Sequence, residues 1–242
     1  AIYRKSENQV KREKITDTAK EVKRFEDAKD TAKQQLAGLY DKALKEVGEV
    51  NAAIFEVHQM MLMDLDYVDS IKNIITTQEV NAEYAVATTG DNFSRMFASM
   101  DDAYMQGRAS DVKDVSDRLL GILSDAGESG VVADEPVIVA ADDLVPSETV
   151  QLDKSKVLAF ATMYGSANSH TAILARTMNI PAVIGLGEGL AKEYDGHMAA
   201  IDGFTGTIYI DPDEETMKAM TEKREEDRRQ TVSYTHLRAH ET

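Results

Sequence analysis

The sequence predicts an α/β domain that carries an all-α helical-bundle insert. Residues 16–126 contain no proline and few glycines, and apolar residues recur there at helical spacing. After Glu135, short runs rich in β-branched residues alternate with helical runs. We therefore expect residues 15–126 to form the helical subdomain and residues 127–211 the α/β domain. Residues 1–14 are expected to start that α/β domain with a truncated first strand.

The predicted insert consists of helices whose apolar residues repeat every three or four positions. Ile15, Ala19, Val22 and Phe25 begin such a stripe, which continues through Leu44. A long helical hairpin is the simplest structure that this first stretch could form. Further helices are expected at residues 50–63, 67–76, 80–100 and 103–123, followed by a connecting loop at residues 127–134.

The α/β domain is predicted from short apolar runs that are separated by turn residues such as Asp195-Gly196. Residues 212–230 are charged on all sides, which predicts a linker helix. Residues 231–242 lack apolar periodicity, and we interpret them as a non-native tail. The predicted strands lie at residues 137–140, 157–162, 182–184, 198–201 and 208–210.

The composition excludes several classes of function. The absence of cysteine removes disulfides and thiolate chemistry, and a net charge of -16 disfavours binding to nucleic acid. We expect no membrane insertion and a cytoplasmic location, because no apolar run is long enough to cross a bilayer. Residues 51–150 hold 5 basic and 19 acidic side chains. This stretch is either a solvated acidic face or a surface that steers a basic partner.

A histidine at the start of a predicted helix is the strongest chemical signal. Residues 165–176 read GSANSHTAILAR, and residues 179–185 read NIPAVIG. This order predicts a strand, a glycine loop, a histidine, a helix, a turn and a second strand. Ser169 or Asn168 can cap the helix and place His170 in its first turn, where the free backbone N–H groups favour an anion. A neutral imidazole is a nucleophile, and a phosphorylated imidazole is such an anion.

These residues resemble the signature of phosphohistidine swivelling domains, which enzyme I of the bacterial sugar phosphotransferase system shares with pyruvate phosphate dikinase and phosphoenolpyruvate synthase. Residues 146–149, PSET, are also similar to enzyme I. In the predicted insert, residues 53–58 (AIFEVH) and 108–114 (RASDVKD) resemble the enzyme I subdomain that binds the carrier protein HPr. The chain is thus identified as similar to the amino-terminal part of the enzyme I family. A swivelling domain of a dikinase-like or synthase-like enzyme remains the alternative.

The resemblance implies that His170 accepts a phosphoryl group from phosphoenolpyruvate through a carboxy-terminal barrel absent from this chain, and passes it to a histidine of HPr. It also implies that the Thr149 hydroxyl hydrogen-bonds the imidazole. No cofactor or metal is expected here, because magnesium belongs to the absent barrel, and this part is expected to be a monomer. The implied HPr-binding residues are Ala53, Ile54, His58, Met60, Met61 and Arg108.

Plainer interpretations of the same residues remain open. His58 lies at helical spacing from apolar neighbours and could pack inside the bundle. Met60 and Met61 could fill the core, and Arg108 could form a surface ion pair. Thr149 could be only a helix cap. A non-catalytic module that keeps the fold for protein binding would also fit the pattern.

Overall fold

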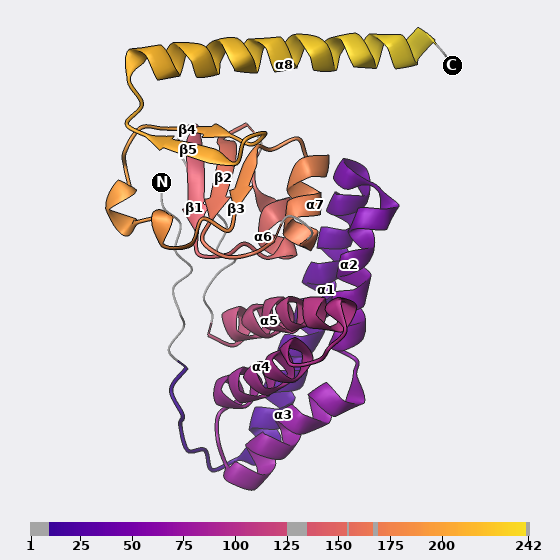
Figure 1. Cartoon of the computed structure of the whole chain (residues 1–242). Helices are drawn as coiled ribbons and strands as arrows, with labels where there is room; N and C mark the ends of the chain where they lie inside the picture. The colour runs from indigo at the N-terminus through magenta and orange to yellow at the C-terminus, as the bar shows by residue number, and fades with distance from the viewer. Residues whose placement is uncertain (1–9, 125–134, 154, 167–168, 241–242) are drawn as a thin grey trace.

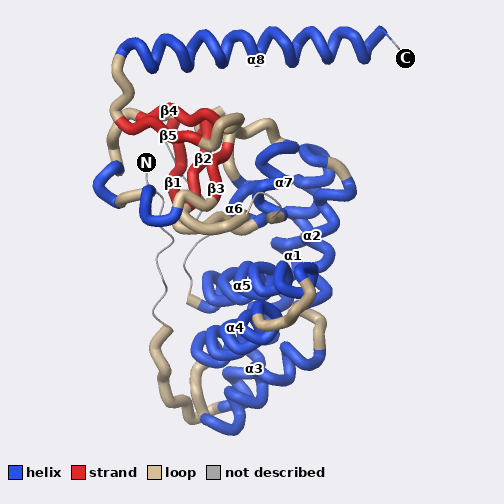
Figure 2. Tube along the Cα trace, in the orientation of Figure 1, coloured by secondary structure: helices blue, strands red, loops and turns tan. Residues whose placement is uncertain are grey.

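The structure, a computed structural model, describes residues 10–124, 135–153, 155–166 and 169–240 (Figure 1). Helices α1–α5 form one region and the five strands gather in another, as Figure 2 shows, which confirms the predicted fold class. The helices are α1 (Thr18–Val47), α2 (Glu49–Met61), α3 (Leu65–Gln78), α4 (Ala82–Ala98), α5 (Ala103–Leu123), α6 (Pro146–Gln151), α7 (His170–Thr177) and α8 (Glu214–His240). The strands are β1 (Val137–Ala141), β2 (Val157–Thr162), β3 (Ala182–Ile184), β4 (Ala199–Asp202) and β5 (Thr207–Ile210).

Helix α1 is one continuous helix of 30 residues rather than the predicted hairpin. The hairpin forms instead between α1 and α2, where Gly48 turns the chain with a φ of 81° that favours glycine. Nothing breaks α1 earlier, since Gly38 sits at an exposed helical position. The buried stripe consists of Phe25, Ala28, Ala32, Leu36, Leu39, Ala43 and Val47.

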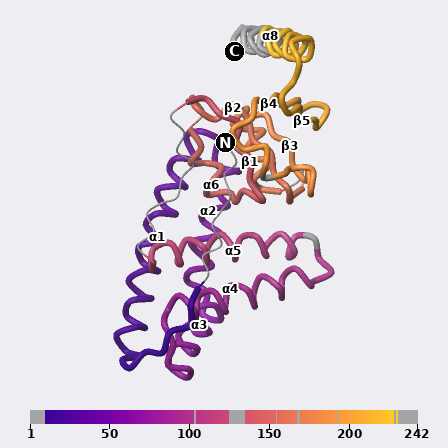
Figure 3. The backbone as a smooth tube through the Cα atoms, turned by 90° about the vertical axis from the view of Figure 1, so that its left-hand side faces the viewer, coloured from indigo at the N-terminus to yellow at the C-terminus, as the bar shows by residue number. Residues whose placement is uncertain are grey.

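Helices α4 and α5 lie side by side (Figure 3), and a glycine allows their close approach. A β-carbon added to Gly90 would lie 2.8 Å from the β-carbon of Ser116 and still closer to its hydroxyl oxygen. That hydroxyl also hydrogen-bonds the buried Tyr67 hydroxyl of α3 at 2.7 Å. The middle of the bundle therefore has no room for a side chain at position 90.

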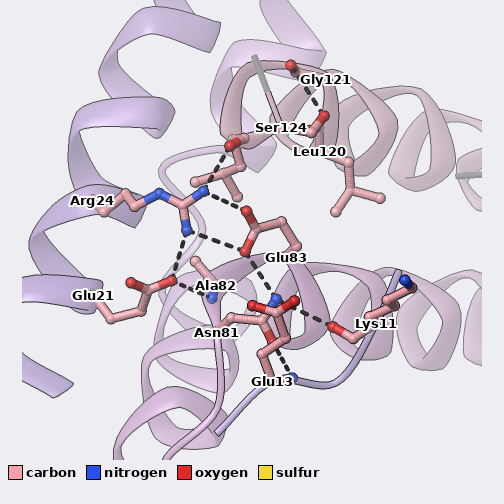
Figure 4. Close-up of polar contacts among 11 residues, drawn as sticks. Lys11, Glu13, Glu21, Arg24, Asn81, Ala82, Glu83, Leu120, Gly121 and Ser124 are labelled. Atoms are coloured by element: carbon pink, nitrogen blue, oxygen red, sulfur yellow. Dashed lines mark hydrogen bonds and ion pairs between the residues drawn. The ribbon is translucent and has the colours of Figure 1, made fainter. Parts of the chain in front are cut away.

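A network around Arg24 ties the ends of α1, α4 and α5 together (Figure 4). The Arg24 guanidinium pairs with Glu21 and Glu83 and donates to the Leu123 carbonyl at 2.6 Å. Glu21 in turn accepts from the Ala82 backbone N–H at 2.7 Å. Burial by itself would raise the pKa of Glu83, but the hydrogen bonds from Arg24 and Asn81 lower it below its ordinary value.

The sheet contains β1, β2 and β3 in that order, all parallel, while β4 and β5 form an antiparallel pair. Val137 pairs with Val157 and Ile138 with Ala159, so Leu158 is an extra residue at a bulge. Its side chain is half-exposed in an otherwise buried strand. The predicted strand positions are confirmed, with ends that differ by one residue at β1, β4 and β5.

The two faces of the parallel sheet pack against cores of different size. Phe160 of β2 belongs to the main core, which continues without a break into the buried stripes of α1–α5. Its neighbour Ala161 points to the opposite face, where a small core with Ala140 and Leu190 packs near the β4–β5 pair. The apolar packing thus joins the sheet to the helical region and makes one structure of the two.

Helix α8 extends beyond its predicted end at residue 230 and reaches His240 (Figure 1). The sequence holds no glycine or proline between Glu214 and His240 to end the helix. Lys223 of α8 pairs with Asp202 at the end of β4, which lowers the pKa of Asp202 to about 2. In the part of the chain that the structure describes, no helix is long and apolar enough to cross a membrane. The loop predicted at residues 127–134 lies outside the described residues.

Candidate functional site

The loop after β2 places His170 as the first residue of α7, as the sequence predicts. Ser169 caps the helix, because its side chain accepts a hydrogen bond from the Ala172 backbone N–H at 3.2 Å. Thr171 fixes α7 against the loop after β1, since its buried hydroxyl donates to the Leu144 carbonyl at 2.6 Å. Gly165 has a φ of 103°, and a β-carbon there would lie 3.0 Å from Ile184 of β3. The alternative cap, Asn168, lies outside the described residues.

The other end of α7 turns directly into β3. Asn179 adopts a φ of 58°, and its backbone N–H donates to the Arg176 carbonyl at 3.1 Å. The Ile180 N–H donates to the Ala175 carbonyl at 2.9 Å, which completes a Schellman motif. Pro181 follows and prevents further helix. The sequence after the histidine therefore ends the helix and returns the chain to the sheet, with the helix start at the carboxyl edge of the parallel strands.

His170 is exposed and lines a cavity of about 270 Å³ between α7 and the helical region. Figure 1 shows α7 beside α2 at this junction. Each helix contributes residues three or four positions apart, which lie on one face. The lining consists of Val50, Asn51, Ala53, Ile54 and Val57 of α2, Tyr104, Gly107, Arg108 and Asp111 of α5, and His170, Ile173 and Leu174 of α7.

Arg108 supplies a positive charge to this cavity. Its guanidinium carbon lies 4.8 Å from the centre of the Tyr104 ring, and one of its nitrogens hydrogen-bonds the Tyr104 hydroxyl. A second guanidinium nitrogen lies 3.6 Å from an oxygen of the buried Asp111. These contacts hold a cation in the lining of the cavity that His170 also lines.

The predicted partner residues separate into two groups. Ala53, Ile54 and Arg108 line the cavity with His170. Met60 lies further along α2 with 58% of its surface exposed, whereas Met61 is partly buried against the main core. His58 is fully buried, so a partner cannot touch it directly in this structure. The sequence predicted the helix of His58 correctly, but the structure places its side chain on the face of α2 that α5 covers.

Thr149 is fully buried in α6, which packs against α7. Its hydroxyl donates to the Val145 carbonyl at 3.1 Å, a bond within its own helix. Among the described residues no hydrogen bond joins Thr149 to His170, and the predicted contact between them stays a prediction. The hydroxyl oxygen keeps lone pairs that could accept from an imidazole N–H.

Two exposed residues of the cavity were missed by the sequence analysis. Val50 is 88% exposed and Tyr104 is 69% exposed, and both line the cavity. Val50 precedes Ala53 and Ile54 by three and four residues, and Tyr104 precedes Arg108 by four. Helical spacing from the predicted partner residues was therefore the signal that could have found them.

No group of three His, Cys, Asp or Glu side chains gathers as possible metal ligands within the described ranges. No step proposed below passes through a metal.

Two family models match the chain, one for each region. The model described as "PEP-utilising enzyme, N-terminal" matches residues 1–108, and the model described as "PEP-utilising enzyme, mobile domain" matches residues 133–206. The second match contains His170, and the first covers α1–α4 and the start of α5.

Curated relatives and solved structures give the same result over both regions. The chain is 39% identical over 215 residues to phosphoenolpyruvate-protein phosphotransferase of Bacillus subtilis (strain 168), covering 88% of this chain and 38% of that protein. It is 43% identical over 203 residues to the protein of the same name from Lactococcus lactis subsp. lactis (strain IL1403), covering 83% of this chain and 35% of that protein. The chain thus spans less than half the length of these relatives.

Among solved structures, the NMR solution structure of Enzyme I (nEIt) matches with a TM-score of 0.70 and 33% identity, covering 94% of this chain and 93% of that one. The structure named N-terminal domain of Enzyme 1 - Nitrogen has a TM-score of 0.59 at 24% identity, which supports the fold alone. Both matches include the helical region as well as the α/β region. The chain belongs to the enzyme I, or phosphoenolpyruvate-protein phosphotransferase, family and corresponds to its amino-terminal portion with the mobile phosphohistidine domain.

Proposed function

We propose that His170 carries a phosphoryl group, which the full-length protein draws from phosphoenolpyruvate and this chain passes to a histidine of HPr. The observation that carries the proposal is the cavity in which the exposed His170 and the fixed cation Arg108 share one lining. A phosphorylated imidazole there would meet both the positive end of the α7 helix dipole and the Arg108 charge. Both features stabilise the dianionic phosphoryl group.

The transfer needs positioning and charge neutralisation more than covalent chemistry from the protein. A lone pair of the neutral acceptor imidazole would form the new P–N bond while the bond to His170 breaks and its electron pair returns to the His170 ring. Arg108 would neutralise the phosphoryl oxygens as they move between the rings. Thr149 would orient His170 by accepting a hydrogen bond from the ring nitrogen that does not carry the phosphoryl group.

We infer that HPr docks on the helical subdomain, residues 15–126, at the mouth of the cavity. Ala53 and Arg108 would form the part of this surface next to His170, with the buried Ile54 beneath them, and Met60 would extend it along α2. Exposed Val50 and Tyr104 supply apolar surface around the cation, which suits an interface with charge at its edge. The acidic excess of residues 51–150 supports a basic partner whose binding weakens with salt.

The dikinase-like alternative gains no support from the relatives described above. The phosphotransferases and the Enzyme I (nEIt) structure match this chain over the helical region as well as the α/β region. The proposal therefore keeps a histidine of a carrier protein, and not a nucleotide, as the exchange partner of His170.

Incubation with phosphorylated HPr tests the proposed function. The intact mass of the wild-type chain should rise by one phosphoryl group, and His170→Ala should abolish this gain. His197→Ala is the matched control, because His197 is a partly exposed histidine of the same domain that pairs with Asp211 and does not line the cavity. Labelling that persists in His170→Ala, or a wild-type chain that stays unlabelled, would contradict the assignment.

A further inference from the structure

Three buried ionisable side chains lie between α2 and α5 without a part in the proposed transfer. His58 is fully buried, Asp111 is 1% exposed and Asp114 is 3% exposed. One ring nitrogen of His58 lies 3.4 Å from Asp111 and the other lies 3.8 Å from Asp114. Burial of ionisable groups costs free energy unless opposite charges and hydrogen bonds compensate for it. The contacts of these three side chains therefore show what their burial is used for.

Asp114 reaches from the helical region into the α/β region. Its two carboxylate oxygens accept from the Ser147 hydroxyl at 2.6 Å and from the Ser147 backbone N–H at 3.2 Å. Ser147 is the second residue of α6, whose N–H groups have no partner within the helix. Val145 at the N-cap position has no side-chain oxygen, so Asp114 takes over the role of a cap from another region of the chain.

The opposite end of the same cluster reaches the cavity. Asp111 pairs with Arg108 on one side and faces His58 on the other. The contacts therefore run from Arg108 through Asp111, His58 and Asp114 to the start of α6. Helix α6 packs on α7. In the loop between β1 and α6, the Leu144 carbonyl accepts a hydrogen bond from the hydroxyl of Thr171, the residue next to His170.

His58 lies between the two carboxylates of this cluster, and each of its ring nitrogens faces an oxygen of one of them. Both distances are longer than those of good hydrogen bonds, so the contact between the ring and the carboxylates is mainly electrostatic.

We propose that Asp114 and His58 are positioning residues that hold the α/β region against the helical region and thereby set His170 opposite Arg108. This inference rests on the proposed function, because it concerns the geometry in which His170 exchanges its phosphoryl group. Neither residue touches the substrate. Asp114 acts through Ser147 and α6, and His58 acts through Asp111 and Arg108.

Asp114→Asn and Ser147→Ala, singly and together, test in the intact chain whether the contact between Asp114 and Ser147 positions the two regions. Each single variant should slow single-turnover transfer from saturating phosphorylated HPr by on the order of tenfold to a hundredfold, because a small misplacement of reacting groups costs that much. The double variant should be no slower than Asp114→Asn alone, because both changes break one contact. Final labelling should reach the wild-type level.

The relative orientation of the two regions is the second readout. Residual dipolar couplings measured by NMR should show a changed or broadened orientation in Asp114→Asn and Ser147→Ala. Thr177→Ala is the matched control, because between the same regions it removes only the exposed 3.4 Å hydrogen bond from Asn51, besides the bond of its own hydroxyl to the Ile173 carbonyl within α7. It should keep both the wild-type rate and the wild-type orientation.

The ring of His58 gives a third readout. Its ¹H and ¹⁵N chemical shifts should change in Asp114→Asn, because the ring faces Asp114, and they should stay as in the wild type in Thr177→Ala. Unchanged ring shifts in Asp114→Asn would overturn the part assigned to His58.

The positioning role of Asp114 would be refuted if Asp114→Asn and Ser147→Ala kept the wild-type rate and orientation while the wild-type chain was labelled normally. That result would leave the proposed function intact. A wild-type chain that accepts no phosphoryl group would refute the proposed function. The orientation measurement would still decide whether Asp114 holds the two regions together.

Discussion

The helical region and the α/β region of this chain are stabilised in different ways. In α1–α5, each helix buries a stripe of residues spaced three or four positions apart, and α1 alone contributes seven such residues. Among the described residues the parallel sheet has three strands, and its larger core face is completed by α6, α7 and the helical region. Its other face holds a small core around Ala140, Ala161 and Leu190.

This difference shows where the functional geometry comes from. The helical region can be specified by patterns within single segments, whereas the position of the α/β region depends on contacts between segments far apart in the sequence. The cavity lies where the two meet, and residues of α2, α5 and α7 complete it. A change in the sheet should therefore affect the helices, and changes within the bundle should stay more local.

The largest effect is expected for Phe160→Ala in β2. Phe160 is fully buried in the core that both regions share, so its truncation should cost about 3–5 kcal/mol of unfolding free energy. Urea unfolding followed by circular dichroism should show the helices and the sheet still unfolding together at a lower midpoint. Leu158→Ala, at the half-exposed bulge of the same strand, should change little. If the sheet of Phe160→Ala unfolded at a lower urea concentration while the unfolding transition of the helices stayed unchanged, the two regions would not share one core.

An intermediate effect is expected for Gly90→Ala within the bundle. The added methyl group would collide with Ser116 and force α4 and α5 apart, at a cost of about 1–3 kcal/mol. Gly38→Ala is the control, since it meets nothing within 4 Å on α1 and should stabilise the helix by about 0.5–1 kcal/mol. Thermal unfolding of the two variants should therefore shift in opposite directions. Equal shifts would show that the α4–α5 contact is not tight.

The smallest effect is expected for Glu83→Gln in the Arg24 network. The folded state lowers the pKa of Glu83, so this carboxyl stabilises the fold above its ordinary pKa of about 4.3 and the contribution disappears as the pH falls through the lower folded value. The variant should lose at most about 1 kcal/mol at neutral pH and show a weaker loss of stability on acidification. Exposed Glu56→Gln is the control. An acid profile of Glu83→Gln identical to wild type would exclude the network from acid stability.

The sequence predicted most elements because their signals are local. The apolar stripe of α1 and the turn at Asn179-Ile180-Pro181 act within a few residues, and the structure follows them. The prediction of a hairpin within α1 was wrong because the stripe does not mark where a helix ends, and only Gly48 ends it. The end of α8 was also placed too early, since lack of apolar periodicity does not by itself stop a charged helix.

The sequence by itself determined that His170 would begin a capped helix after a strand and a glycine loop, because Ser169 and the residues after the histidine control their own backbone. Only the tertiary structure decided that His170 shares a cavity with Arg108, that His58 is buried, and that Asp114 caps a helix of the other region. Helical periodicity states which residues share a face, but not which face a distant segment covers. That choice depends on long-range packing and on the pairing of buried charges, which no local pattern encodes.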